Sequence, residues 1–149
     1  MAEGREGIDE GVAMNREARI ADKIAKEILL EDLFDEVKEE WSGMSKNHGL
    51  KALSVIGSGR GEGIFLADER SKKLTGVMAY ELKKNMIFIL EMATRKSGEG
   101  VGKEMLQILK KENRRKPIVA ITEYGAGGFW LKMGFEPWKE GSHLMIWKP

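Results

Sequence analysis

The chain has 149 residues, of which 42% are hydrophobic and 33% charged, and its 25 basic and 24 acidic side chains give a net charge of +1. This composition is typical of a soluble globular domain, and the balanced charge gives no general reason to bind nucleic acid or an anionic membrane. The sequence has no cysteine, which excludes disulfides and thiol nucleophiles, and its two histidines are far apart, so we expect no metal site. The acidic start lacks an apolar signal segment and no stretch is apolar enough to span a bilayer, so we expect a cytoplasmic protein.

The N-terminal third is predicted to be mainly helical. Residues 1–15 carry little pattern, and we expect a flexible segment there, followed by a single domain over residues 16–149. Apolar residues recur at helical spacing over residues 16–41, which predicts an amphipathic helix that could break in two near Glu31 and Asp32. The following SGMSKNHG is predicted to be a loop. The next segment, LKALSVIG, fits either a short strand or the end of a helix.

The middle and end of the chain are predicted to form a sheet with interspersed helices. GIFLADE, KKLTGVMAYEL and NMIFILEMAT are apolar runs rich in β-branched or aromatic residues, and the short polar connectors between them favour antiparallel hairpins. A helix is predicted after Gly102, and it ends by the RRKP run because Pro117 disfavours helical geometry at the preceding residue. PIVAITE is predicted to be a strand, AGGFWLKMG a short helix and FEPWKEGSHLMIWKP a closing hairpin. This order of elements indicates an α+β layer fold.

The stretch RKSGEGVGKEML, residues 95–106, places three glycines within five residues between a predicted strand and a predicted helix. Such a junction directs backbone N–H groups and the positive end of the helix dipole at one point, which suits a phosphate group. It is not a Walker A loop, because Ser97 and Glu104 stand where that motif needs Gly and Ser or Thr. It is not a dinucleotide-binding fingerprint either, because Lys103 and Met105 stand at the two positions for a third glycine.

The segment GEGVG followed by KEML resembles the pyrophosphate loop of the GNAT N-acetyltransferase superfamily, whose pattern is Gln/Arg-x-x-Gly-x-Gly/Ala before a helix. A second segment, FWLKMGF at residues 129–135, looks like the aromatic–Tyr–x–x–hydrophobic–Gly–Phe signature of that family, with the small residue Ala126 upstream. The resemblance covers residues 62–149. It implies a GNAT-like mixed, mostly antiparallel central sheet with helices on both faces. The fourth and fifth strands, here residues 86–94 and 117–123, would splay apart to hold acetyl-CoA.

The resemblance also implies the cofactor site. Acetyl-CoA is expected as the co-substrate, with no metal; its pantetheine would pair with the strand edge around residues 92–94, and its pyrophosphate would accept hydrogen bonds from backbone amides around residues 97–103. The residues expected to bind it are Met92, Ala93, Thr94, Ser97, Gly98, Glu99, Gly100, Val101, Gly102, Lys103, Phe129 and Trp130. Two registers of the loop motif are open, starting at Arg95 or at Ser97. We prefer the second, because it places Met105 and Leu106 where the helix begins to pack.

The reaction implied is direct attack of a primary amine on the thioester in a ternary complex, with a base for the ammonium and often an acid for the leaving thiolate. Many family members carry Tyr at the position of Trp130, and an indole N–H is far too weak an acid for that role. Tyr124 is the substitute acid, and Glu91 and Glu123 are the candidate bases. The competing interpretation of Glu91 is a solvated or ion-paired strand carboxylate, and His48 is interpreted as a surface loop residue.

The partners follow from the same resemblance. The acceptor is expected to be a small-molecule or peptide amine, and the family is compatible with a homodimer; we expect neither nucleic acid nor membrane as a partner. The alternative hypothesis is a non-catalytic acyl-CoA-binding or regulatory GNAT-like module, which the substitution at Trp130 and the lack of an obvious base both motivate.

Overall fold

The computed structural model describes residues 23–121, 127–138 and 143–149, with side chains from Leu30 onward. The N-terminal segment expected over residues 1–15 lies outside the described residues. The described elements, in chain order, are α2 (Lys23–Glu40), α3 (Gly43–Gly57), β1 (Glu62–Ala67), β2 (Leu74–Leu82), β3 (Ile87–Thr94), α4 (Val101–Glu112), β4 (Ile118–Ile121), α5 (Gly127–Lys132), β5 (Glu136–Pro137) and β6 (Leu144–Trp147).

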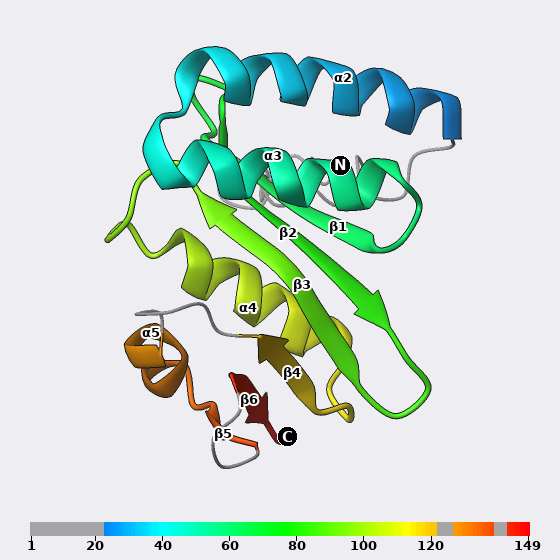
Figure 1. Ribbon diagram of the computed structural model, residues 1–149, viewed down its shortest axis with the longest axis vertical. Coiled ribbons are helices and arrows are strands. Elements are labelled where there is room, and N and C mark those ends of the chain that lie inside the picture. The colour runs from blue at the N-terminus through cyan, green and yellow to red at the C-terminus, as the bar shows by residue number, and fades with distance from the viewer. Residues whose placement is uncertain (1–22, 122–126, 139–142) are drawn as a thin grey trace, which may run out of the picture.

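The strands form one six-stranded sheet in the order β1-β2-β3-β4-β6-β5 (Figure 1). Neighbouring strands are antiparallel, except that β3 and β4 run parallel with α4 as the crossover between them. The predicted strands, the helix after the glycine loop, the short helix α5 and the closing hairpin are all present. The predicted α+β, mostly antiparallel fold is therefore confirmed.

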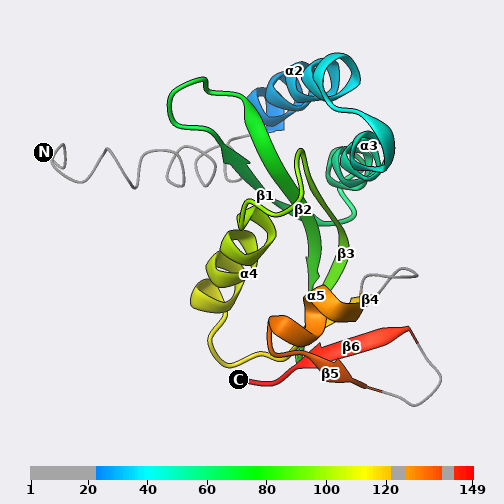
Figure 2. The ribbon, with the colours of Figure 1, turned by 90° about the vertical axis from the view of Figure 1, so that its left-hand side faces the viewer.

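Helices cover both faces of the sheet (Figure 2). One face carries α2 and α3, whose apolar side chains form a core cluster with Val77, Ala79 and Ala93 of the sheet. The other face carries α4, and Met105 and Leu109 of this helix pack in a second cluster that includes Trp130 of α5. Two hydrophobic cores, one on each face, therefore hold strand β3 between them.

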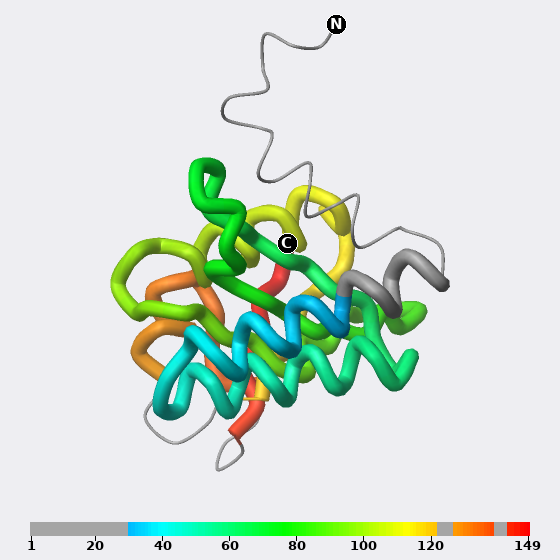
Figure 3. Tube along the Cα trace, turned by 90° about the horizontal axis from the view of Figure 1, so that it is seen from above, coloured from blue at the N-terminus to red at the C-terminus, as the bar shows by residue number. Residues whose placement is uncertain are grey.

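The two N-terminal helices differ from the sequence prediction. Helix α2 continues through Glu31 and Asp32 without a break, and α3 occupies the SGMSKNHG segment that was predicted to be a loop. This segment contains two glycines, and glycine is unfavourable within a helix unless packing requires it. Gly49 allows the α3 backbone to lie close to Trp41 and Val37, since a Cβ atom at this position would be 3.0 Å from the Trp41 ring and 3.2 Å from Val37. The glycine therefore lets α3 lie directly against the end of α2, and Figure 3 shows the two helices side by side across the sheet.

Strands β3 and β4 separate after a short parallel ladder. Their pairing begins at Ile87 with Ile118 and ends at Ile89 with Ala120, although β3 continues to Thr94. The predicted splayed pair of strands is thus confirmed, with residues 122 and 123 of the expected second strand outside the described residues. The splay leaves residues 90–94 of β3 without a described partner strand on that side.

A β-bulge in β3 lies at the start of the splay. Ala79 of β2 pairs with Glu91 and Tyr80 pairs with Ile89, so Leu90 is the extra residue. A bulge shifts the alternation of side chains by one position. Ile89 and Met92 accordingly pack on the α4 side of the sheet, whereas Leu90 packs on the α3 side, where Glu91 also contacts α3. Glu91 and Met92 therefore point to opposite faces of the sheet.

Candidate active site

The glycine loop between β3 and α4 forms a turn that most side chains would strain. Gly98 and Gly100 have φ angles of +80° and +76°, in the left-handed region that glycine adopts without a steric penalty. Gly100 is also the N-cap residue of α4, so the unpaired N–H groups of the first helical turn follow it directly. Gly102 lies within that turn, and a Cβ atom there would be 3.1 Å from Phe129. The loop therefore leads directly into the free N–H groups of the first turn of α4.

A cavity of about 400 Å³ lies against this loop, and we call it the loop cavity. It is lined by the end of β3, by the glycine loop with the first turn of α4, and by Phe129 and Met133 beside α5. The structure thus brings together the predicted cofactor-binding residues Met92, Ala93, Thr94, Ser97, Gly98, Glu99, Gly100, Val101, Gly102, Lys103 and Phe129. Sequence reasoning missed Lys96 and Met133, which line the same cavity.

Arg95, at the beginning of the loop, is engaged with helix α2. Its guanidinium lies 3.5 Å from Oε1 of Glu40, and Lys73 lies 2.7 Å from Oε2 of the same carboxylate. The hydrogen bond from Lys73 lowers the pKa of Glu40, and the nearby Arg95 acts in the same direction. Ser97 lines the loop cavity, and Met105 and Leu106 are fully buried. The preferred register, which starts at Ser97, requires Met105 and Leu106 to pack at the start of the helix, and both residues do pack there.

A second cavity, of about 350 Å³, lies toward helix α3, and we call it the α3 cavity. Its lining comes from α3, β3, the end of β4 and α5; the residues are His48, Lys51, Ile89, Leu90, Glu91, Met92, Ile121, Phe129 and Trp130. Met92 and Phe129 also line the loop cavity. The two cavities therefore meet at these side chains, beside the segment where β3 and β4 splay apart.

Glu91 is the buried polar group of the α3 cavity. Its side chain is 8% exposed, and its Oε1 lies 2.9 Å from Nδ1 of His48 while its Oε2 lies 3.4 Å from Nζ of Lys51. A carboxylate is costly to bury unless opposite charges and hydrogen bonds compensate it. Since an ionised carboxylate only accepts hydrogen bonds, Nδ1 of His48 is the donor in this pair. Glu91 is thus ion-paired, as its competing interpretation held, and it also faces the cavity.

His48 is placed differently from the sequence prediction. It belongs to α3 rather than to a loop, and its side chain is 25% exposed because it faces Glu91 across the α3 cavity. The sequence signal that could have found it is helical spacing. His48 and Lys51 are three residues apart and so lie on one face of a helix, but that spacing is informative only once the segment is known to be helical.

Trp130 is buried, with 5% exposure, and packs edge-on against two aromatic rings. The ring centroids lie 5.1 Å from Phe129 and 4.9 Å from Phe135. The structure places Trp130 in the lining of the α3 cavity and does not place it in the loop cavity. Glu123, Tyr124 and Ala126, the other residues singled out near this point, lie outside the described residues.

Lys110 of α4 holds the end of α5 in position. Its Nζ donates a hydrogen bond of 3.0 Å to the carbonyl oxygen of Met133 and lies 4.6 Å from the centroid of the Trp147 ring. Burial lowers the pKa of this ammonium group. A cation at a helix C-terminus is favourable, and here it fixes the short helix that carries Phe129 and Trp130.

Within residues 23–121, 127–138 and 143–149, no group of His, Asp or Glu side chains is arranged to hold a metal ion. In the same part of the chain, no helix combines the length and apolar character that a membrane crossing requires.

The glycine loop before α4 and the splay of β3 from β4 are two features that the resemblance to the GNAT superfamily implied. No protein-family model and no curated protein sequence matches this chain. Solved structures do match in fold. Gcn5 of Tetrahymena aligns over 80% of this chain and 86% of its own, with 17% identity and a TM-score of 0.58.

Two further structures carry coenzyme A. The N-acetyltransferase YlbP of Bacillus subtilis, solved with coenzyme A, aligns over 78% of this chain and 89% of its own, with 16% identity and a TM-score of 0.53. The N-acetyltransferase PaiA of Thermoplasma acidophilum, also with coenzyme A, covers 99% of this chain and 94% of its own, with 17% identity and a TM-score of 0.51. The chain therefore has the GNAT fold, at low sequence identity to these proteins.

Proposed function

We propose that this protein is an N-acetyltransferase that transfers the acetyl group of acetyl-CoA to a primary amine by direct attack in a ternary complex. The observation that carries the proposal is the meeting of the loop cavity and the α3 cavity at Met92 and Phe129. One cavity offers a cradle of backbone N–H groups for a pyrophosphate. The other offers a buried carboxylate for an amine. An acyl transfer between two substrates needs two such sites with a common border.

Acetyl-CoA binds in the loop cavity in this proposal. Its pyrophosphate accepts hydrogen bonds from the loop amides, and the dipole of α4 favours its negative charge. Lys96 and Lys103, which line the cavity, add positive charge. The pantetheine arm runs along residues 90–94 of β3, the segment that has no described partner strand on the side of β4. The thioester then reaches the border with the α3 cavity.

Glu91 acts as the base for the acceptor ammonium. Its carboxylate contacts His48 and Lys51, and the cavity around these three residues is otherwise largely apolar. The bulge at Leu90 interrupts the ladder with β2 close to this point. We assign the thioester oxygen to backbone N–H groups at the bulge, because a donor fixed in place before the reaction stabilises the developing negative charge.

Trp130 is the observation that favours the alternative, a non-catalytic acyl-CoA-binding module. Its indole cannot protonate a departing thiolate. A thiolate is nevertheless an adequate leaving group without an acid, since the pKa of a thiol is only moderately above neutrality. The substitution at Trp130 therefore does not remove the proposed activity.

Binding is tested by thermal unfolding with and without acetyl-CoA. We expect acetyl-CoA to raise the Tm of the native chain and Gly100→Val to reduce the rise, because stabilisation by a ligand falls as its affinity falls. Gly59→Val is the matched control, because Gly59 has a similar φ of +78°, nothing within 4 Å of its Cβ position, and no contact with either cavity. The control should lose stability by a similar amount and keep the rise in Tm. A native chain whose Tm does not respond to millimolar acetyl-CoA would refute the proposal.

Catalysis is tested by the release of free thiol from acetyl-CoA with a panel of primary amines. The proposed transferase releases thiol at a rate that depends on the amine. A binding module shows the rise in Tm and no release with any amine of the panel.

A further inference from the structure

Lys51 places a primary ammonium group of the chain itself next to the proposed base. Its Nζ lies 3.4 Å from Oε2 of Glu91, and its side chain is 65% exposed whereas that of Glu91 is 8% exposed. Lys51 also lines the α3 cavity together with Glu91 and Met92. A base must lie within hydrogen-bonding reach of the proton that it removes. The Lys51 ammonium therefore occupies the position at which an acceptor amine would meet Glu91.

Among the described residues, His48 and Lys51 contact Glu91 in different ways. His48 makes the shorter contact, 2.9 Å to Oε1, from a side chain that is 25% exposed. Lys51 makes the longer contact, 3.4 Å to the other oxygen, through a flexible four-carbon stem, and its side chain is 65% exposed. His48 thus fixes the carboxylate, while Lys51 is free to leave it and swing toward the border that the α3 cavity shares with the loop cavity.

We propose that Lys51 is a self-acetylation site of this protein, an inference that rests on the proposed function. The Lys51 ammonium gives one proton to the Glu91 carboxylate, and the neutral amine attacks the carbonyl carbon of acetyl-CoA. The C–N bond forms and the C–S bond breaks, so that coenzyme A leaves as a thiolate with the bonding electron pair. The second proton lost by the nitrogen neutralises the thiolate, and Glu91 returns its proton to solvent. The products are acetylated Lys51, coenzyme A and one proton, with no change of oxidation state.

The modification changes the charge of the α3 cavity. An acetylated lysine has no positive charge, so the ion pair with Glu91 is lost while the hydrogen bond from His48 remains. The acetyl group also adds bulk at the entrance to the cavity. When acetyl-CoA is present without an amine, self-acetylation therefore changes both the charge and the free space of the acceptor site.

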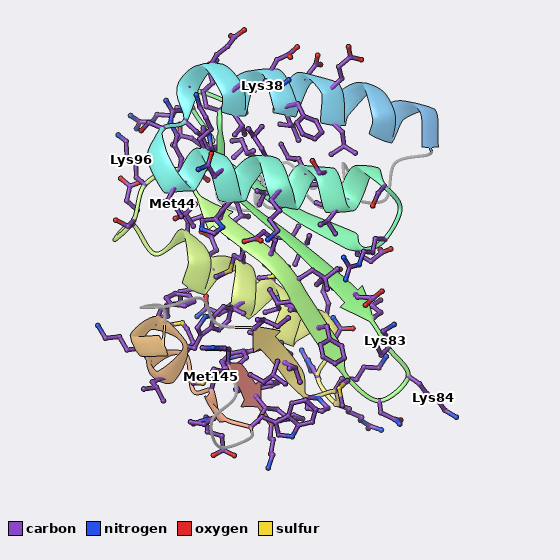
Figure 4. The ribbon with its side chains drawn as sticks, in the orientation of Figure 1. Lys38, Met44, Lys83, Lys84, Lys96 and Met145 are labelled. Atoms are coloured by element: carbon purple, nitrogen blue, oxygen red, sulfur yellow. The ribbon has the colours of Figure 1, made fainter. Side chains whose placement is uncertain are left out.

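The experiment needs no knowledge of the natural acceptor. The purified full chain is incubated with acetyl-CoA alone, and acetylation of each lysine is followed over time by site-resolved mass spectrometry. Lys84 is the internal control for non-enzymatic acetylation. It is exposed, it lies at the turn between β2 and β3 (Figure 4), and it lines neither cavity.

We expect the initial rate at Lys51 to exceed that at Lys84 by at least about tenfold, since a positioned base alone contributes roughly 10²–10⁴-fold. The rate per molecule should not depend on protein concentration, because the donor and acceptor sites belong to one chain. Glu91→Gln should bring Lys51 to the rate of Lys84, and Lys51→Arg should remove the modified peptide. Wild-type protein unfolded in urea should lose the preference for Lys51, which keeps the test valid if the Glu91 variant does not fold.

The failure of this inference is distinguishable from failure of the proposed function. Equal rates at Lys51 and Lys84, in a chain that acetyl-CoA stabilises and that releases thiol with an external amine, overturn self-acetylation and leave the transferase intact. A rate per molecule that rises with protein concentration overturns acetylation within one chain. The absence of both stabilisation by acetyl-CoA and thiol release overturns both proposals.

Discussion

The loop cavity and the α3 cavity share Met92 and Phe129, yet they are built from different parts of the chain. The loop cavity depends on the backbone of one continuous segment, in which Gly98 and Gly100 adopt left-handed conformations. The α3 cavity depends on side chains of distant segments, with His48 and Glu91 separated by 43 positions in the sequence. A site built from backbone groups tolerates substitution of neighbouring side chains, whereas a site built from side chains loses its function when one of them is replaced.

The sharpest contrast is expected at Glu91. Glu91→Gln should reduce the rate of thiol release with a primary amine by about 10²–10⁴-fold, because a positioned base is lost. The affinity for acetyl-CoA should stay within about twofold of the wild-type value, since the Glu91 side chain lines the α3 cavity and not the loop cavity. A twofold change in affinity is well under the roughly 1.4 kcal/mol that a tenfold change represents. Steady-state kinetics and titration calorimetry measure the two effects.

Glu81→Gln is the matched control for that prediction. Glu81 also lies on a strand and pairs with a lysine, at 3.5 Å from Lys83, but it lines neither cavity. It should leave both the rate and the affinity unchanged. A rate for Glu91→Gln equal to that of wild type would remove Glu91 from the mechanism and separate the α3 cavity from catalysis.

A substitution in the loop backbone should produce the opposite pattern. Gly100→Val should weaken acetyl-CoA binding by about tenfold or more, because a left-handed residue with a branched side chain carries roughly 1–3 kcal/mol of strain and relaxes by redirecting the loop amides. Thiol release at saturating acetyl-CoA should fall far less than the affinity. Calorimetry with acetyl-CoA and kinetics over a wide acetyl-CoA range distinguish the two; an unchanged dissociation constant would contradict a backbone-built site.

His48 tests whether the α3 cavity depends on one hydrogen bond. His48→Leu should lower kcat by about tenfold or more, since a hydrogen bond to a charged group contributes roughly 1.5–3 kcal/mol. His48→Asn restores a donor close to the position of Nδ1 and should recover most of the lost rate. KM for acetyl-CoA should stay constant in both variants. Equal loss in the two variants would mean that His48 only fills space.

The ion pairs that attach the loop to α2 predict a dependence of stability on pH. The pKa of Glu40 is lowered in the folded state by its hydrogen bond with Lys73, so its contribution to stability is present above the ordinary carboxyl pKa and is lost as the pH falls through the lowered value. Glu40→Gln should therefore have a slightly lower Tm than wild type near neutral pH, and the two curves should converge in acid. Thermal unfolding across a pH series measures this; parallel curves would contradict it.

The smallest effects are expected from side chains of the loop itself. Ser97→Ala and Glu99→Ala should change the dissociation constant of acetyl-CoA by no more than about twofold, because the contacts of a backbone site do not involve these side chains. The same calorimetric titration as for Gly100→Val gives the comparison. A large loss in Ser97→Ala would show that the loop binds through side chains, and the contrast between the two cavities would disappear.

The loop cavity was predictable because the determinants of a backbone turn are local. Glycines at fixed spacing before an amphipathic helix specify where N–H groups point, whatever the remainder of the chain does. The same locality explains why the strands and α4 were predicted with bounds close to those observed. The first half of α3 was predicted to be a loop, because the tertiary role of Gly49, its close approach to Trp41, has no local signal in the sequence.

By itself, the sequence determined the glycine turn before α4 and the order of the helices and strands around it, because these depend on residues that are neighbours in the chain. The splay of β3 from β4 was implied by the resemblance to the GNAT superfamily. Only the tertiary structure decided which side chains face the α3 cavity. The bulge at Leu90 turns Glu91 toward α3, where His48 and Lys51 meet it. Strict strand alternation would have placed Glu91 on the face of Ile89, against α4. Side chains from distant segments meet only after two helices and a bulged strand have packed, and no local pattern encodes that meeting.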